Sequence, residues 1–222
     1  DYHTILDNPQ INTVFITTRH SSHPHMVVEA LNAGKHVFVE KPLAIDEEGI
    51  ERVRRAIADH PAQQLMVGFN RRFAPHAVAV RALLSGRSQP VSLEIMVNSG
   101  EIPANHWLQD PQIGGGRIIG EGCHFVDLLR FLVGHPFRTV QAVMFGRDSG
   151  GVPDDKATIS FTFEDGSIGT LHYWSNGPRS YPKERVEIFS EGRALVIDNW
   201  RRLDAYNWAG AKRMRLLRQN KG

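Results

Sequence analysis

The first candidate for a chemical role is Lys41, which stands at the end of an apolar run. His36-Val37-Phe38-Val39 predicts a buried strand, which Glu40-Lys41-Pro42 ends abruptly. An ammonium group at a strand end can donate a hydrogen bond to a ligand oxygen and stabilise negative charge that grows there. Pro42 restricts the backbone and so aims Lys41, and we expect that the Lys41–Pro42 peptide could be cis. The alternative is an ordinary surface lysine after a strand.

A histidine beside a helical core stripe is the second candidate. Phe125, Leu128, Leu129 and Leu132 recur at helical spacing, and His124 lies off that stripe. Its imidazole could act as an acid/base group, and Glu121, three residues earlier, could orient it or bind substrate. The alternative is a structural histidine at the start of a helix. Cys123, beside His124, is interpreted as a packed thiol rather than a nucleophile.

Two loops offer further polar or flexible groups. Gly114-Gly115-Gly116 precedes the histidine-bearing helix and could let an anionic substrate approach the backbone, or could be a plain flexible loop. Thr18 and Ser22 follow a predicted strand and could cap the helix that comes next. The spacing of His20, His23 and His25 suggests a metal, but no cysteine or carboxylate completes the set, so we predict no metal site.

The elements that must position these residues fall into two series. Up to about Asn70, predicted strands at 13–17, 36–39 and 65–69 alternate with two helices, one reaching Gly34 and one capped by Asp46. This order predicts a parallel sheet with crossover helices. The second series has a helix at about 75–84, a helix at about 116–133 and strands at 91–98, 139–146, 157–163, 167–174, 185–190 and 193–198. Turn signals at Glu164-Asp165-Gly166 and Glu191-Gly192 predict that these strands form an antiparallel sheet.

Composition excludes several classes of protein. Of the 222 residues 41% are hydrophobic and 23% charged, and the net charge of +2 is too balanced to make nucleic acid the main partner. No apolar run has the length of a membrane span, and a single cysteine fits a cytoplasmic location. The basic segment from Lys212 to Arg218 could contact nucleic acid or an anionic membrane, but a solvated helix face, or a segment that awaits its missing continuation, is the preferred interpretation.

The first series lacks one expected feature. A dinucleotide-binding fold usually begins with a strand, a G-x-G-x-x-G turn and a helix, and that fingerprint is absent here. Either the first half of a doubly wound domain is missing, or this domain was never a dinucleotide binder. The first residues, Asp1-Tyr2-His3, lack an initiator methionine, so we also expect the chain to be a fragment.

Three segments carry a family resemblance. NTVFITTRHSSHPHMVVEALNAGKHVFVEKPLAID resembles the second half of the nucleotide-binding domain of the Gfo/Idh/MocA oxidoreductases, the family of glucose-fructose oxidoreductase and inositol dehydrogenase. GGGRIIGEGCHFVDLL resembles the family's second signature, and GFNRRFAP resembles its link between domains. The Gly-Glu-Gly-Cys-His form resembles the half of bi-domain oxidoreductases that is fused to an alcohol-dehydrogenase-like half.

The resemblance implies a fold, a cofactor and several roles. Residues 1–72 would be the second half of a Rossmann-type domain, with a partial Rossmann-like parallel sheet. Residues 73–222 would be an α+β domain for substrate binding and oligomerisation, shortened at its carboxyl end. Its open-faced, mainly antiparallel sheet would form a homo-oligomer through its exposed face. Lys41 and His124 would be catalytic, with NAD or NADP held by residues at the strand ends: Thr17, Thr18, His23, Glu40, Lys41 and Pro42. The substrate, a sugar or cyclitol, would lie near four residues: Arg72, His106, Trp107 and Gly116.

The resemblance leaves alternatives open. Arg72 could instead form a salt bridge at the domain interface, and Trp107 could be a buried residue at a domain junction. The family usually has an aspartate four residues before the histidine, where this chain has Gly120. From the resemblance as a whole we expect an NAD(P)-dependent oxidoreductase that transfers a hydride to or from a sugar-like substrate. We expect this chain alone to bind the dinucleotide weakly. The alternative is a sensor, regulator or dimerisation module with the same fold.

Overall fold

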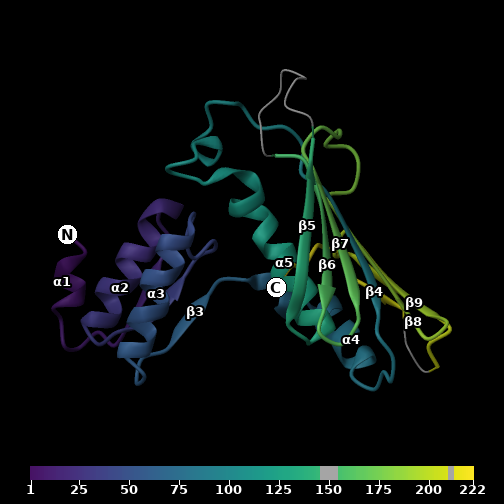
Figure 1. The fold of residues 1–222 in the computed structure, drawn as a ribbon, viewed down its shortest axis with the longest axis horizontal. Coiled ribbons are helices and arrows are strands. Elements are labelled where there is room, and N and C mark those ends of the chain that lie inside the picture. The colour runs from purple at the N-terminus through teal and green to yellow at the C-terminus, as the bar shows by residue number, and fades with distance from the viewer. Residues whose placement is uncertain (146–154, 210–212) are drawn as a thin grey trace. The chain divides into compact units, whose positions relative to one another are not determined.

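The computed structural model describes residues 1–145, 155–209 and 213–222 (Figure 1). These residues form two compact units, which are described one at a time. The first comprises Asp1–Phe69 and Ala104–Cys123, and the second comprises Asn70–Pro103 and His124–Gly222. Residues 104–123 therefore belong to the first unit although they lie within the second series of elements. The expected division between residues 72 and 73 stays a prediction.

The first unit contains a three-stranded parallel sheet. Its strands are β1 (Thr13–Ile16), β2 (His36–Val39) and β3 (Leu65–Val67), in the order β1-β2-β3. The crossovers are α2 (His23–Asn32) and α3 (Glu47–Asp59), and a short helix, α1 (His3–Leu6), precedes β1. Side chains at alternate positions of β1 and β2 are buried with residues of α2 and α3, which makes the core of this unit. The predicted Rossmann-like arrangement is confirmed.

Local signals explain where the helices begin and end. The Asp46 side chain accepts a hydrogen bond of 2.7 Å from the Gly49 amide and so caps α3. Pro24 occupies the first turn of α2, where a missing amide proton costs nothing. Gly34 follows α2 with a φ of +73°, a left-handed conformation that ends the helix.

The second unit contains an eight-stranded sheet in the order β11-β10-β9-β8-β4-β7-β6-β5. The bounds are β4 (Ser92–Asn98), β5 (Phe137–Met144), β6 (Ala157–Phe163), β7 (Ile168–Trp174), β8 (Glu184–Ser190), β9 (Arg193–Asp198), β10 (Arg202–Tyr206) and β11 (Met214–Arg215). Among the described strand pairs of this eight-stranded sheet, only β4 and β7 are parallel. The sheet is therefore mainly antiparallel, as predicted.

One face of this sheet packs against helices and the other is open. Helix α5 (Cys123–Val133) buries the predicted stripe, and a Cβ at Gly169 of β7 would lie 3.1 Å from Leu129, so helix and sheet are in close contact. Helix α4 (Pro75–Leu84) buries Ala77, Val80 and Leu84, whereas its Val78 is exposed. On the open face, register aligns Ile168, Phe189 and Tyr206 in one row across the sheet, and each is about half exposed.

Several details differ from the sequence predictions. The described part of the basic carboxyl segment contains β11 rather than a helix, so the helix interpretation is wrong; Lys212 lies outside the described residues. Strand β10 was not predicted. Strand β5 begins at Phe137 and ends at Met144, and Gly146 lies outside the described residues. The predicted helix at 116–133 begins with a π-helical turn, Ile118–Gly122. In the described part of the chain, no helix is long and apolar enough to cross a membrane.

Candidate active site

Lys41 lies where the sequence predicts it, just beyond the carboxyl end of β2. The Glu40 amide still donates to the Ile16 carbonyl at 2.9 Å, which continues the pairing between β1 and β2 by one residue. The Lys41–Pro42 peptide is cis, as expected. The half-buried Lys41 side chain ends with Nζ donating to the Gly120 carbonyl at 2.8 Å. Two of its three ammonium protons therefore remain available for a ligand.

Glu40 and Pro42 build the loop around this lysine. A Cβ at Gly68, just beyond β3, would lie 3.2 Å from the Glu40 carboxylate, so this glycine leaves room for the acid. The Pro42 carbonyl accepts a hydrogen bond of 2.8 Å from Nδ1 of His23. No described contact tests the cofactor roles of Glu40 and Pro42, which stay predictions.

His23 is fully buried and lies between two loops. Its second ring nitrogen, Nε2, is 3.0 Å from the Thr18 carbonyl. The ring therefore ties the loop after β1 to the loop after β2, and both ring nitrogens already face backbone carbonyls. This makes His23 a support for Lys41 and Pro42, and its predicted contact with a cofactor is untested.

The threonines after β1 are exposed. Thr18 Oγ1 lies 2.7 Å from Ser22 Oγ, and Ser22 Oγ donates to the Arg19 carbonyl. Ser22 is the N-cap residue of α2, as the capping alternative expects, but among the described residues no side chain makes a capping hydrogen bond to this helix. The Thr17 and Thr18 side chains stand at the carboxyl edge of the sheet, where ligands of open α/β sheets bind.

The glycine run makes a tight turn against its own loop. A Cβ at Gly114 would lie 2.4 Å from the Leu108 backbone, which no side chain could tolerate. Gly116 has a φ of +80° and open space around it, so its backbone is accessible. The His106 ring accepts a hydrogen bond of 3.2 Å from the Leu108 amide and starts the short helical turn Trp107–Gln109. The roles of His106, Trp107 and Gly116 in binding substrate stay predictions.

His20 is a residue of this site that the sequence predictions missed. It is 6% exposed, and its Nδ1 lies 2.8 Å from the Gly114 carbonyl. The edge of its ring meets Trp107 at 4.8 Å between centroids, and the Arg19 guanidinium lies over the same indole at 5.3 Å. Burial lowers the pKa of His20, and the charge of Lys41 lowers it further, against an opposing effect of the Gly114 carbonyl. The only sequence signal for His20 is its spacing from His23 and His25, which suggests a metal site rather than this position.

The other predicted residues have structural partners that the sequence did not reveal. In the first unit, Glu121 accepts a hydrogen bond of 3.2 Å from Arg117. In the second unit, His124 is buried at the start of α5, and Arg72 forms a two-pronged ion pair with Asp127 of the same helix. Arg72 therefore forms a salt bridge within the second unit, and the expected salt bridge at a domain interface stays a prediction. The catalytic roles of His124 and Glu121 stay predictions.

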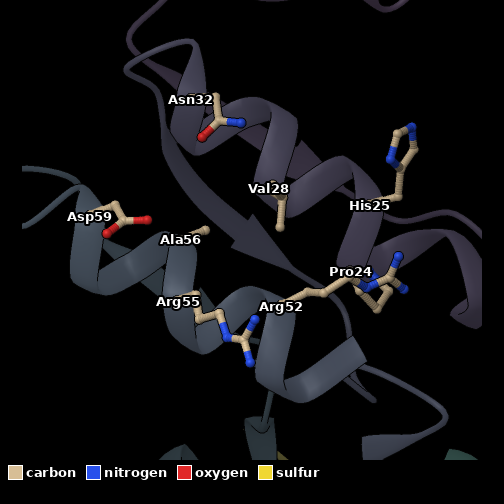
Figure 2. A pocket seen from close by; sticks show the side chains of 8 residues that line it. All are labelled: Pro24, His25, Val28, Asn32, Arg52, Arg55, Ala56 and Asp59. Atoms are coloured by element: carbon tan, nitrogen blue, oxygen red, sulfur yellow. The ribbon is translucent and has the colours of Figure 1, made fainter. Parts of the chain in front are cut away.

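A separate groove lies between two helices of the first unit. It has a volume of about 360 Å³ and is bounded by His25, Val28 and Asn32 of α2 and by Arg52, Arg55 and Asp59 of α3 (Figure 2). His25 Nε2 lies 3.4 Å from the Glu29 carboxylate one helical turn later. None of the residues predicted for the active site lines this groove. In the described ranges, no cluster of histidine, cysteine or carboxylate side chains could hold a metal ion.

The fold and this site define a class of protein. One unit has a three-stranded parallel sheet with crossover helices and polar residues at its strand ends, and the other has a mainly antiparallel sheet. The model of the GFO/IDH/MocA C-terminal domain matches residues 80–196, and that of the oxidoreductase family, NAD-binding Rossmann fold, matches residues 1–69. The chain belongs to the Gfo/Idh/MocA family.

Individual relatives support this assignment. The chain is 28% identical over 207 residues to the uncharacterized oxidoreductase YrbE of Bacillus subtilis, covering 90% of this chain and 59% of the relative. It is 29% identical over 196 residues to inositol 2-dehydrogenase of Rhizobium meliloti, covering 86% of this chain and 58% of the relative. The chain therefore spans less than two thirds of the length of these curated relatives.

Solved structures show the same fold. An oxidoreductase domain protein from Kribbella flavida superposes with a TM-score of 0.83 at 27% identity, covering 98% of this chain and 64% of the other. Levoglucosan dehydrogenase in complex with NADH and levoglucosan also gives a TM-score of 0.83, at 25% identity, covering 97% of this chain and 64% of the other.

Proposed function

We propose that this chain is part of an NAD(P)-dependent oxidoreductase that moves a hydride between a nicotinamide cofactor and a sugar-like or cyclitol substrate. The observation that carries the proposal is the position of Lys41. It stands at the carboxyl edge of a parallel sheet, fixed by the His23–Pro42 contact and by its own bond to Gly120. The relatives with named activities include inositol 2-dehydrogenase and levoglucosan dehydrogenase, which act on polyhydroxylated substrates.

In this reaction Lys41 would bind the hydroxyl group of the carbon that is oxidised. Its ammonium donates a hydrogen bond to that oxygen, and the bond strengthens as the carbon loses hydride and the oxygen gains negative charge. His124 would accept the hydroxyl proton, so that a ketone or lactone remains. Glu121 would orient that imidazole or bind another part of the substrate.

The residues present fit a nicotinamide cofactor. Exposed Thr17 and Thr18 hydroxyls stand at the same carboxyl edge of the sheet as Lys41 and its flanking Glu40, and the Gly68 backbone lies close to the Glu40 carboxylate there. When bound, NAD or NADP would supply the hydride acceptor. Arg72, His106, Trp107 and Gly116 would contribute to the substrate side. A cytoplasmic location, expected from the single cysteine, remains part of the proposal.

A turnover assay tests the proposal. It would use a polypeptide in which this chain follows a glycine-rich dinucleotide-binding unit, with NAD⁺ or NADP⁺ and a panel of cyclitols and sugars. Lys41→Met should lower kcat by about a hundredfold or more, because it removes a charge that stabilises the transition state. Arg52→Met, which removes an exposed cation from the same unit, should leave kcat unchanged. Turnover that survives Lys41→Met would contradict the assignment.

We further propose that the open face of the eight-stranded sheet joins two copies of this protein. The row of Ile168, Phe189 and Tyr206 supports this, because half-exposed apolar side chains in register form an apolar patch that a second copy can bury. Sedimentation equilibrium of the chain should show a dimer or larger oligomer that Phe189→Lys dissociates. A monomer at all concentrations would contradict the proposal.

A further inference from the structure

We propose that His20 is a further ligand-binding residue of this site and that, together with Lys41, it recognises two adjacent hydroxyl groups. In this arrangement one ligand oxygen accepts a hydrogen bond from Lys41 Nζ, and the neighbouring hydroxyl donates to His20 Nε2. The inference deepens the proposed function and rests on it for the ligand position at Lys41.

His20 and Lys41 converge on one residue of the same unit. They follow β1 and β2, two parallel neighbours whose carboxyl ends share an edge of the sheet. Lys41 Nζ donates to the Gly120 carbonyl at 2.8 Å, and a Cβ at Gly120 would lie 3.0 Å from His20 Cε1. Both side chains therefore adjoin Gly120.

The hydrogen bond to Gly114 fixes the tautomer of His20. A carbonyl oxygen only accepts hydrogen bonds, so the Nδ1 atom that lies 2.8 Å from it must carry a proton. In a neutral ring Nε2 then holds a lone pair, and burial together with the charge of Lys41 favours the neutral ring by lowering the pKa of His20. Among residues 1–145, 155–209 and 213–222, none donates a hydrogen bond to Nε2.

The two side chains offer opposite hydrogen-bonding roles. Lys41 only donates, whereas neutral His20 with a protonated Nδ1 only accepts at Nε2. A ligand with vicinal hydroxyls satisfies both, because each hydroxyl can donate and accept. A carboxylate or fully ionised phosphate has no proton for His20 and would satisfy Lys41 alone. The pair therefore favours a polyol over an anion.

His20 could instead be only a latch that holds the loop 104–123 through Gly114, and two substitutions separate the roles. In His20→Asn the amide nitrogen can replace Nδ1, which keeps the latch and removes the acceptor. In His20→Gln the amide oxygen can replace Nε2, which keeps the acceptor and loses the latch. If His20 binds the ligand, His20→Asn should lose more ligand affinity than His20→Gln. If His20 is only a latch, His20→Gln should lose more affinity than His20→Asn.

The test is a titration of the 222-residue chain, with histidine side chains labelled with ¹⁵N, against myo-inositol, with cyclohexanol as the single-hydroxyl control. In the free chain at neutral pH, His20 should carry its proton on Nδ1. Myo-inositol should shift the Nε2 resonance, and cyclohexanol should not. His20→Asn should weaken myo-inositol binding about tenfold, in line with the loss of one hydrogen bond, while His20→Gln should stay within about threefold of the unaltered chain.

Each contrary result has a separate meaning. A proton on Nε2 in the free chain, or His20→Asn binding as tightly as the unaltered chain, overturns the inference. If myo-inositol shifts the amide resonances of Lys41 and Gly120 but not His20 Nε2, the inference fails and the proposed polyol site stands. If no resonance of these three residues shifts, the proposed polyol site fails and the inference fails with it.

Discussion

Gly120 is the residue on which the geometry of the candidate site depends, and replacing it with alanine gives a quantitative prediction. A Cβ there would lie 2.6 Å from Leu108 Cδ1 and 3.0 Å from His20 Cε1. The leucine methyl can rotate away, but the His20 ring is held by the Gly114 carbonyl and by Trp107. Overpacking of this kind costs about 1–3 kcal/mol, and the movable leucine places this site toward the lower half, at about 1–2 kcal/mol.

Gly122 is a matched control in the same helical turn. A Cβ there would lie 3.7 Å from Ile118, an ordinary contact, so Gly122→Ala should gain only the usual helix preference of alanine, about 0.5–1 kcal/mol. Gly120→Ala receives a similar gain. The difference in free energy of unfolding between the two variants therefore isolates the overpacking cost of about 1–2 kcal/mol.

Urea unfolding followed by circular dichroism measures this difference. The ¹⁵N resonances of His20 provide a second readout, because only Gly120→Ala should move that ring. Equal stability of the two variants, with His20 unperturbed in both, would refute the packing described around Gly120.

Three further predictions concern stability and cofactor binding. Glu184 has a fully buried side chain that accepts from Arg71 at 3.0 and 3.1 Å, so Glu184→Gln should cost about 3–5 kcal/mol in urea unfolding. Glu187 forms a partly exposed ion pair with Arg185, so Glu187→Gln should cost at most about 1 kcal/mol; equal losses would contradict this. Burial opposes ionisation of Glu184, but Arg71 and Lys221 hold its pKa below 4.5, so its stabilising contribution is present above pH 4.5 and is lost as the pH falls through the lower folded value. Burial lowers the pKa of His76, and neither ring nitrogen has a hydrogen-bond partner in the described residues. The folded chain should therefore lose stability as the pH falls below 6.5, because the unfolded chain binds the proton more readily. His76→Leu should flatten that part of a curve of stability against pH, and an unchanged slope would contradict this prediction. Calorimetry of this chain with NADH should show weak binding, because its sequence lacks the glycine-rich turn, and tight binding would overturn that expectation.

The sequence predicted what depends on local pattern. Strand-end placement of Lys41 followed from an apolar run that ends in charge and proline, and the cap of α3 followed from Asp46. The α5 stripe and the two predicted hairpins were equally local signals.

What the sequence could not predict depends on contacts between distant segments. His20 acquires its tautomer from the Gly114 carbonyl, 94 residues later, and Arg71 meets Glu184 across 113 residues. Strand β10 was missed because Arg202 and Asp204 interrupt its apolar pattern, although Asp204 is buried and ion-paired with Arg202 in the structure. Pairing of this kind needs a sheet neighbour, which no local window contains.

The most direct test of the central claim is a crystal structure of this chain joined to a glycine-rich dinucleotide-binding unit, with NADH and myo-inositol bound. The account predicts that Lys41 Nζ and a ring nitrogen of His124 both lie within about 3.2 Å of the same substrate oxygen. A structure with the two side chains in separate compartments, or with the substrate oxygen in contact with neither, would contradict it.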